Sequence, residues 1–255
     1  MLDLFSVVSP TTFALLGITG LVAGFINTVA GGGSLLTMPA MIFLGIPPTS
    51  ANGSLRPAIL FQNIIACWKY RQEGLIPWRQ VGPMLPPVLV GTALGAGITA
   101  QISNENTKLI LGASLIISLS FILLPARPIT QSKPENSTWR RVGKPLTLLT
   151  VGLYGGAIQA GVGYLILGTL KRLFNLPLRE ANIIKVVLVL VYTPLAIIFF
   201  AKEGQIVLWA SVTLALSQGI GAWLGATFNL KGSERWLRGL VATFIVFSIL
   251  KILFF

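Results

Sequence analysis

Short motifs recur in this chain at a constant spacing of 130 residues, and this spacing constrains the fold more than any other feature. The segment LGIPPTSAN (44–52) aligns without gaps with FNLPLREAN (174–182), and GTALGA (91–96) aligns with GAWLGA (221–226). The glycine-rich AGGGS (30–34) aligns with AGVGY (160–164) in the same register. Matches that keep one register indicate two copies of a single structural unit.

The two copies consist mainly of apolar segments. Only 10% of the residues are charged and 54% are hydrophobic, whereas a soluble domain carries about 25% charged residues. We therefore predict an all-α integral membrane protein, because segments of about 20 apolar residues span a bilayer as helices. Ten apolar segments are expected, at about 11–30, 33–45, 55–72, 81–101, 107–125, 145–160, 163–175, 183–201, 207–228 and 236–255.

The distribution of basic residues predicts the topology. Each copy has five segments, an odd number, so the second copy should be inverted relative to the first. Strict alternation then places 15 of the 19 basic residues on the side of loops 69–79, 126–144, 171–185 and 231–238. An excess of Lys and Arg marks the cytoplasmic side. We predict a first repeat (1–125), a cytoplasmic linker (126–144) and an inverted second repeat (145–255) in the cytoplasmic membrane, with both termini periplasmic or extracellular.

Glycines interrupt the apolar sequence at equivalent places in the two repeats. The segments that follow, 33–45 and 163–175, have about 13 residues each, or roughly 20 Å as a helix, too short for a hydrocarbon core of about 30 Å. Inverted-repeat transporters often bind substrate where two such broken helices meet. A helix that starts after a break offers free N–H groups and a positive dipole end, which favour an anion.

Polar residues and glycines around the two breaks are the candidate substrate-binding residues. Amide and hydroxyl groups can donate hydrogen bonds to an anion without carrying charge. Arg56 and Lys185 are expected on opposite sides of the membrane, where each would attract an anion at one mouth. The full set is Asn27, Gly31, Gly32, Gly33, Ser34, Asn52, Arg56, Gln159, Gly161, Gly163, Tyr164, Asn182 and Lys185.

Each candidate also has a purely structural interpretation. Small residues allow helices to pack closely, and this interpretation is favoured for single glycines such as Gly91 and Gly95. Asn52 and Asn182 are also suited to cap a helix N-terminus. Arg56 and Lys185 would reach the membrane interface if they only extended their charged ends to water.

An ordered set of motifs resembles the sulfite exporter TauE/SafE family over essentially the whole chain. The set comprises AGGGS, then LGIPP followed by Ala51-Asn52, then Tyr70, Arg71, Gly74, Ile76 and Trp78, and finally GTALGA with its second-half counterpart. The resemblance implies a permease that moves small sulfur-containing or organic anions, such as sulfite or sulfonates, across the cytoplasmic membrane. In AGVGY, Val162 and Tyr164 replace the usual Gly and Ser, which leaves the substrate open.

Other classes of protein fit the composition less well. The net charge of +12 lies in loops, as topology signals do, so nucleic-acid binding is not expected. One cysteine, no histidine and acids confined to loops leave no metal, cofactor or catalytic cluster, and no enzyme is predicted. We expect alternating-access export of an anion without an intramembrane proton carrier. The expected partners are a small anion and the lipid bilayer, and a homodimer is one option for the assembly. Import of a similar anion such as thiosulfate or a carboxylate, or a non-transport membrane scaffold, remain alternatives.

Overall fold

The computed structural model describes residues 9–123 and 139–229, and all regular elements in these ranges are helices. The first half contains α1 (Pro10–Ala30), α2 (Ser34–Phe43), α3 (Pro48–Gln72), α4 (Trp78–Val81), a 3-10 turn (Gly82–Met84), α5 (Leu85–Thr99) and α6 (Asn104–Leu123). The second half contains a π-helical turn (Trp139–Gly143), α7 (Lys144–Ala157), α8 (Val162–Leu173), α9 (Leu178–Lys202) and α10 (Leu208–Asn229). The all-helical prediction is therefore confirmed for the described residues.

The expected segments match these helices, with two systematic differences. Helix α3 begins at Pro48 rather than near 55, and α9 begins at Leu178 rather than near 183. Both helices follow a proline, Pro47 or Pro177, whose fixed φ suits the start of a helix. Their first turns are polar, so the apolar run begins later than the helix. The expected tenth segment, 236–255, and most of the linker, 126–144, lie outside the described residues.

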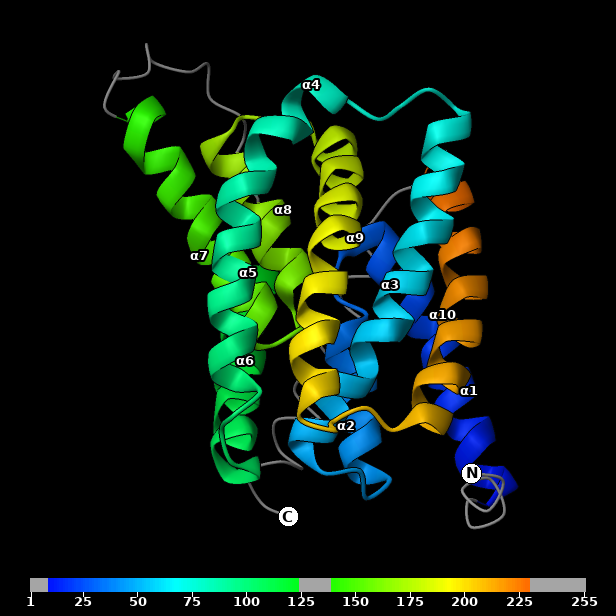
Figure 1. The fold of residues 1–255 in the computed structure, drawn as a ribbon. Coiled ribbons are helices and arrows are strands. Elements are labelled where there is room, and N and C mark those ends of the chain that lie inside the picture. The colour runs from blue at the N-terminus through cyan, green and yellow to red at the C-terminus, as the bar shows by residue number, and fades with distance from the viewer. Residues whose placement is uncertain (1–8, 124–138, 230–255) are drawn as a thin grey trace.

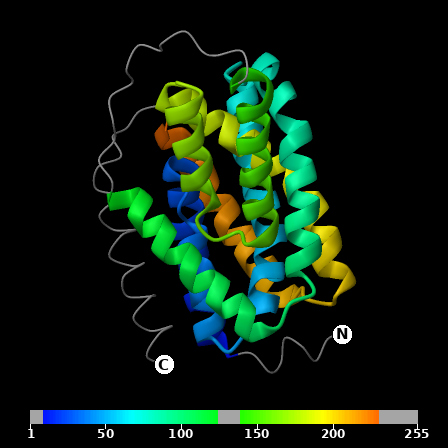
Figure 2. The same cartoon turned by 90° about the vertical axis from the view of Figure 1, so that its left-hand side faces the viewer.

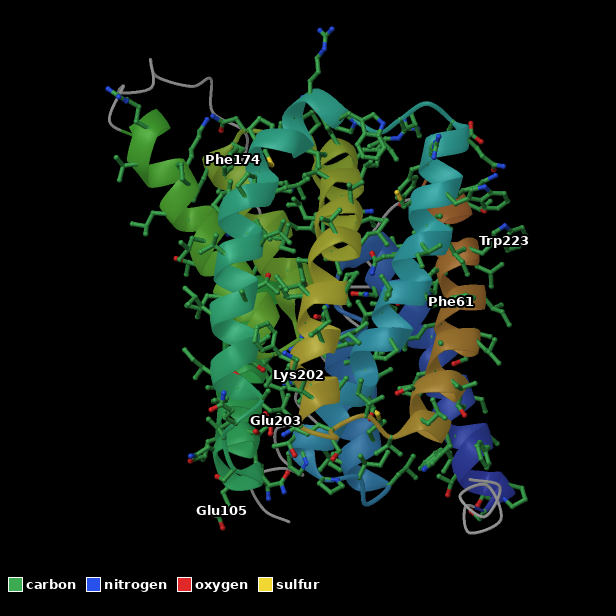
Figure 3. The ribbon with its side chains drawn as sticks, in the orientation of Figure 1. Phe61, Glu105, Phe174, Lys202, Glu203 and Trp223 are labelled. Atoms are coloured by element: carbon green, nitrogen blue, oxygen red, sulfur yellow. The ribbon has the colours of Figure 1, made fainter. Side chains whose placement is uncertain are left out.

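The outer surface is apolar and the charged residues gather at the two ends of the bundle. Large hydrophobic side chains are exposed along the helices, for example Ile18 on α1, Ile98 on α5 and Leu216 on α10. Figure 3 shows Phe61 and Trp223 on the flank of the bundle, whereas Glu105, Lys202 and Glu203 lie near one end. Three stretches, Pro10–Ala30, Trp78–Thr99 and Leu178–Lys202, are long and apolar enough to cross a membrane. This distribution suits a bundle surrounded by lipid.

Two sets of long helices run in opposite directions (Figure 1). Helices α1, α3 and α10 run in the same direction. Along α1 and α10 the contacts advance together, from Gly20 with Leu214 to Thr28 with Gly225. Helices α3 and α10 start side by side, because Ser54 near the start of α3 bonds to Val207 just before α10. Helices α5, α7 and α9 run the other way, and Arg56 near the start of α3 contacts Phe200 at the end of α9. Because α1 and α3 are parallel, the short α2 between them returns the chain toward its starting side.

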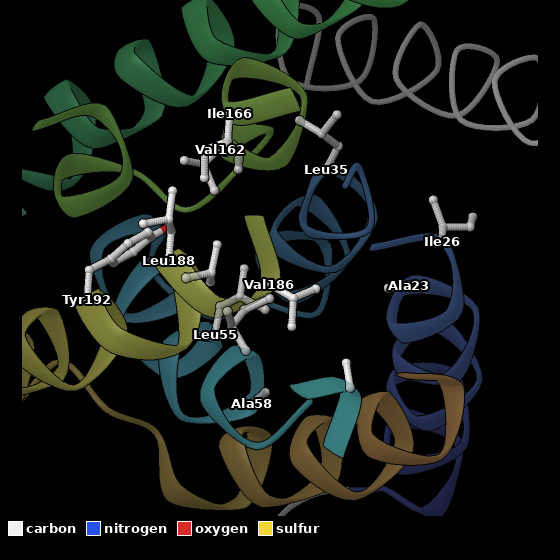
Figure 4. Packing of buried hydrophobic residues seen from close by; sticks show 14 of the residues in the cluster. Ala23, Ile26, Leu35, Leu55, Ala58, Val162, Ile166, Val186, Leu188 and Tyr192 are labelled. Carbon is white, nitrogen blue, oxygen red and sulfur yellow. The ribbon is translucent and has the colours of Figure 1, made fainter. Parts of the chain in front are cut away.

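Helices α1 and α2 therefore form one helical hairpin, and α7 and α8 form a second, because α7 and α9 also run in one direction. The two hairpins lie at the centre of the bundle, with α2 and α8 among the long helices in both views (Figures 1 and 2). Figure 4 shows side chains from both short helices, including Leu35 and Ile166, in the same buried core as residues of α3 and α9. The fold therefore brings the two glycine-rich segments to the interior of the protein.

The closest helix packing joins the first half of the chain to the second. Gly91 and Gly95 of α5 face the backbone of α7 at Leu149 and Leu153, and Gly221 of α10 faces the backbone of α1 at Leu21. A side chain at any of these glycines would collide with a carbonyl group of the other helix. The packing interpretation of Gly91 and Gly95 is therefore correct.

Candidate substrate site

Each hairpin turns at a glycine with a left-handed backbone. Helix α1 ends at Gly31, where φ is 84° and the N–H group bonds to the Asn27 carbonyl at 2.9 Å. In the second hairpin, Gly161 precedes α8 with a φ of 75°. Such angles are strained for residues that have a Cβ atom. The glycine requirement at Gly31 and Gly161 therefore comes from the turn itself.

The tips of the two hairpins lie directly against each other. A methyl group added at Gly163 would lie 2.5 Å from the Cα atom of Gly31, and one added at Gly31 would lie 2.8 Å from the Gly163 carbonyl carbon. The Ser34 hydroxyl oxygen accepts a hydrogen bond from the Gly161 N–H at 3.1 Å. All residues from Gly31 to Ser34 and from Gly161 to Gly163 are buried. The structure thus brings together two breaks that are 130 residues apart in the sequence.

The contact places two helix N-termini next to one another. Helix α2 begins at Ser34 and α8 begins at Val162, both in the contact region. The N–H groups of Leu35, Leu36 and Tyr164 in these first turns bond to carbonyls just before the helices. The N–H groups at the very start of a helix have no acceptor within it, and the helix dipole makes this end positive. The meeting point therefore carries the donors and the partial positive charge that bind anions.

A buried arginine contacts the C-terminal end of α7, the first helix of the second hairpin. Arg56 of α3 is fully buried, with 0% exposure, and its Nη1 atom donates to the Gly155 carbonyl at 3.1 Å. Its Nη2 atom donates to the Gly156 carbonyl at 2.6 Å. The neighbouring Asn52 donates to the Ala157 carbonyl at 2.8 Å. These carbonyls belong to the last turn of α7. The carbonyl groups in the last turn of a helix have no N–H donor within the helix, and this end of the helix carries a partial negative charge.

A buried lysine makes the corresponding contact at the first hairpin. Lys185 of α9 is 2% exposed, and its Nζ atom donates to the Asn27 carbonyl at 2.7 Å and to Asn182 Oδ1 at 2.6 Å. Asn182 donates to the Thr28 carbonyl at 2.8 Å. Each half of the chain therefore supplies an asparagine and a cation that cap the broken helix of the other half.

Two expectations about these residues are wrong. Arg56 and Lys185 lie neither at a mouth nor at the membrane interface, because backbone carbonyls from the opposite half hold them in the interior. Asn52 and Asn182 are not helix N-caps. Pro47 and Pro177 occupy the N-cap positions of α3 and α9, and the asparagines lie in the second turn, where their amides reach across to another helix.

Arg56 has no carboxylate partner in the part of the chain that the structure describes, because its guanidinium bonds to backbone carbonyls and lies over the ring of Phe200. Glu73, Glu105 and Glu203 are exposed, and Glu180 is partly exposed and accepts a bond from Gln80. Asp3, Glu135 and Glu234 lie outside the described residues. Carbonyl dipoles offset only part of the full positive charge of Arg56.

The remaining candidates surround the tips. Asn27 and Tyr164 are partly exposed, whereas Gln159 is buried and its Nε2 atom lies 3.4 Å from the Tyr192 hydroxyl. Gly32 faces the ring of Tyr164, and Gly33 packs against the backbone of α1 at Ala23. All thirteen candidates therefore belong to the two hairpin tips or to the residues that cap them.

A comparison with known families covers nearly the whole chain. The model of the family described as "Sulfite exporter TauE/SafE" matches residues 16–252. The chain belongs to the sulfite exporter TauE/SafE family. The match includes both hairpins, both capping pairs and the long helices around them.

Relatives of this TauE/SafE protein are named as membrane transporters. The "Probable membrane transporter protein ORF9" of Sinorhizobium sp is 32% identical over 59% of this chain and 57% of its own length. The "Probable membrane transporter protein YfcA" of Escherichia coli K12 is 24% identical over 92% of this chain and 87% of its own. A probable membrane transporter of Haemophilus influenzae is 26% identical over 89% of each chain. No solved structure matches.

The structure also adds residues that the sequence did not single out. The Tyr154 hydroxyl donates to the Ala160 carbonyl at 2.8 Å and so ties α7 to the second tip. Gln218 of α10 is buried beside Gly24, and neither atom of its amide has a hydrogen-bond partner among the described residues. The position of Tyr154, six residues before the second break, could have indicated its role. For Gln218 the sequence shows only that a polar residue lies within an apolar run.

Proposed function

We propose that this TauE/SafE membrane transporter exports a small sulfur-containing or organic anion, of the sulfite or sulfonate class, across the cytoplasmic membrane. One observation carries the proposal: Arg56 is fully buried beside the hairpin tips, and its guanidinium bonds to backbone carbonyls with no carboxylate partner among the described residues. A buried charge without a counter-ion is costly. An anion bound beside the two tips supplies a negative charge near Arg56.

The arrangement of the helices supports transport by alternating access. Helices α1, α3 and α5 correspond by the 130-residue spacing to α7, α9 and the second part of α10. Each member of a pair runs opposite to its counterpart, as two inverted repeats would. In such proteins one repeat moves against the other around a central site. We propose that this central site lies at the contact between the hairpin tips.

The two cations have a double role in this proposal. Each holds the end of a broken helix through backbone carbonyls and at the same time raises the electrostatic potential at the tips. The N–H groups at the start of α2 and α8 then make the direct contacts with the anion's oxygens. Arg56, Asn52, Lys185 and Asn182 act as positioning residues, and residues 31–34 and 161–164 form the binding surface.

The membrane potential is sufficient to drive export. The four acids in the described residues lie at helix ends or in loops, so these residues offer no carboxylate for carrying protons through the interior. Moving one negative charge out of a negative-inside cell releases about 2.3 kcal/mol per 100 mV, equivalent to roughly a 50-fold concentration ratio. We therefore propose electrogenic efflux without a coupling ion.

Flux measurements with purified protein in liposomes test this function. Sulfite or methanesulfonate is loaded on one side and a potassium gradient with valinomycin sets the potential. We expect flux that follows the potential and that falls at least tenfold in Arg56→Met. Arg71→Met is the matched control, because Arg71 is exposed at the end of the same helix. Flux that ignores the potential, or equal flux in both variants, contradicts the proposal.

The orientation is part of the same proposal. The basic segments around 69–79 and 171–179 lie at one end of the bundle, at the ends of α3 and α8. We propose that this end is cytoplasmic and that both termini face the periplasm or exterior. A thiol reagent that cannot cross membranes should label Ser103→Cys in intact cells and not Gln72→Cys. The reverse labelling pattern contradicts this orientation. The homodimer stays a prediction.

A further inference from the structure

The two hairpin tips differ at one pair of equivalent positions. Ser34 and Tyr164 are 130 residues apart and each lies at the start of a short helix, α2 or α8. Ser34 is 2% exposed, and its hydroxyl accepts a hydrogen bond from the backbone of the opposite tip at Gly161. Tyr164 presents an aromatic ring to the opposite tip instead. The site is therefore asymmetric although its backbone is duplicated.

The ring of Tyr164 covers the backbone of the first tip. A methyl group added at Gly32 would lie 2.5 Å from the Tyr164 hydroxyl oxygen and 2.6 Å from its Cζ atom. The ring thus rests on the glycine with no room for another side chain between them. Gly32 precedes the first turn of α2, so the ring occupies the space beside the N–H groups at the start of that helix.

The part of Tyr164 that faces the first tip is buried. The residue as a whole is partly exposed, but its hydroxyl oxygen, which lies against Gly32, is buried. Gly31, Gly32, Gly33 and Ser34 of the first tip are buried as well. An aromatic ring held in this position limits the size of what can reach the N–H groups behind it.

We infer that Tyr164 determines the size of the anion that the site accepts. The inference rests on the proposed anion transport and adds a substrate class to it. The site takes compact oxyanions whose substituent is no larger than a methyl or ethyl group, because a longer chain collides with the ring. With serine at this position, as at Ser34, the second tip would leave room for larger organic anions.

A series of alkanesulfonates tests the inference. Flux of methane-, ethane-, propane- and butanesulfonate is measured in liposomes with the wild type, Tyr164→Ser and Tyr164→Phe. We expect the wild type to carry methanesulfonate at least tenfold faster than butanesulfonate. Tyr164→Ser should reduce that ratio to about threefold or less, and Tyr164→Phe should keep the wild-type ratio because it retains the ring.

Each outcome bears on one of the two claims. A wild type with no preference among the four sulfonates, or a Tyr164→Ser variant that carries methanesulfonate with an unchanged ratio, overturns the size role. A wild type that carries none of these anions and no sulfite overturns the proposed function itself. If Tyr164→Ser does not fold, Tyr164→Leu replaces it, and competition by butanesulfonate for methanesulfonate flux in the wild type gives a second measure of size selection.

Discussion

Adding one methyl group at Gly163 should separate the two hairpin tips. In Gly163→Ala the new Cβ atom would lie 2.5 Å from Gly31 Cα and 2.6 Å from its carbonyl carbon, whereas ordinary contacts begin near 3.4 Å. Both obstacles are backbone atoms, so no side-chain rotation relieves the overlap. The Gly31 carbonyl oxygen lies closer still, so the tips must move apart by more than about 1 Å or the turn at Gly31 must deform.

The cost can be worked out from opposing effects. Gly163 lies within α8, where alanine by itself favours the helix by about 1 kcal/mol over glycine. Overfilling a packed interior costs about 1–3 kcal/mol, and rigid backbone places this site at the upper end. The net loss is about 2 kcal/mol, which corresponds to roughly 4–8 °C in melting temperature for a chain of this size.

Transport should suffer more than stability. We expect Gly163→Ala to insert and fold, melt 4–8 °C lower, and lose at least tenfold of its sulfite or methanesulfonate flux. Gly17→Ala is the matched control, because it is also a glycine-to-alanine change in a membrane helix and its Cβ would meet no atom within 4 Å. That variant should melt no lower than the wild type and keep its flux. Wild-type flux in Gly163→Ala would refute the claim that the tips form the site.

Three further substitutions separate the roles of the surrounding residues. Ser34→Ala removes the acceptor of the Gly161 N–H group; the resulting loss of about 1–3 kcal/mol should appear as a lower melting temperature together with reduced flux. Arg56→Lys keeps the charge and loses the fork that reaches two carbonyls; flux should fall, yet exceed that of Arg56→Met. Gly91→Ala collides with α7 away from the tips; calorimetry should show a lower melting temperature, and KM for methanesulfonate should stay unchanged.

The sequence predicts the helices and the position of the breaks because both depend on local features. Apolar runs form helices in a membrane, and glycines such as Gly31 and Gly161 end or start them. The start of α3 could have been predicted more accurately from Pro48, since proline favours the first position of a helix. At α9 the proline, Pro177, lies one position earlier, at the N-cap. Hydropathy alone misses both helix starts because the first turns are polar.

The partners of Arg56 and Lys185 could not be predicted in the same way. Their carbonyl acceptors, at Gly155, Gly156 and Asn27, are 99 to 158 residues away in the chain. A backbone carbonyl is present at every position, so no residue type marks it as a partner. Only the arrangement of the helices determines which carbonyls, left without a donor at the ends of α1 and α7, meet these side chains. The repeat shows which residues are equivalent and not which of them meet.

The crossed capping has a consequence for the order in which the protein assembles. The Asn27 carbonyl receives its cap from Lys185, which is translated 158 residues later. At about 5–20 residues per second, the first hairpin waits roughly 8–30 s for that lysine. Arg56 is made before its carbonyl partners at Gly155 and Gly156 and waits for them in turn. Neither hairpin can complete its capping until part of the other half has been made, so the packing of the first hairpin has to follow the synthesis of α9.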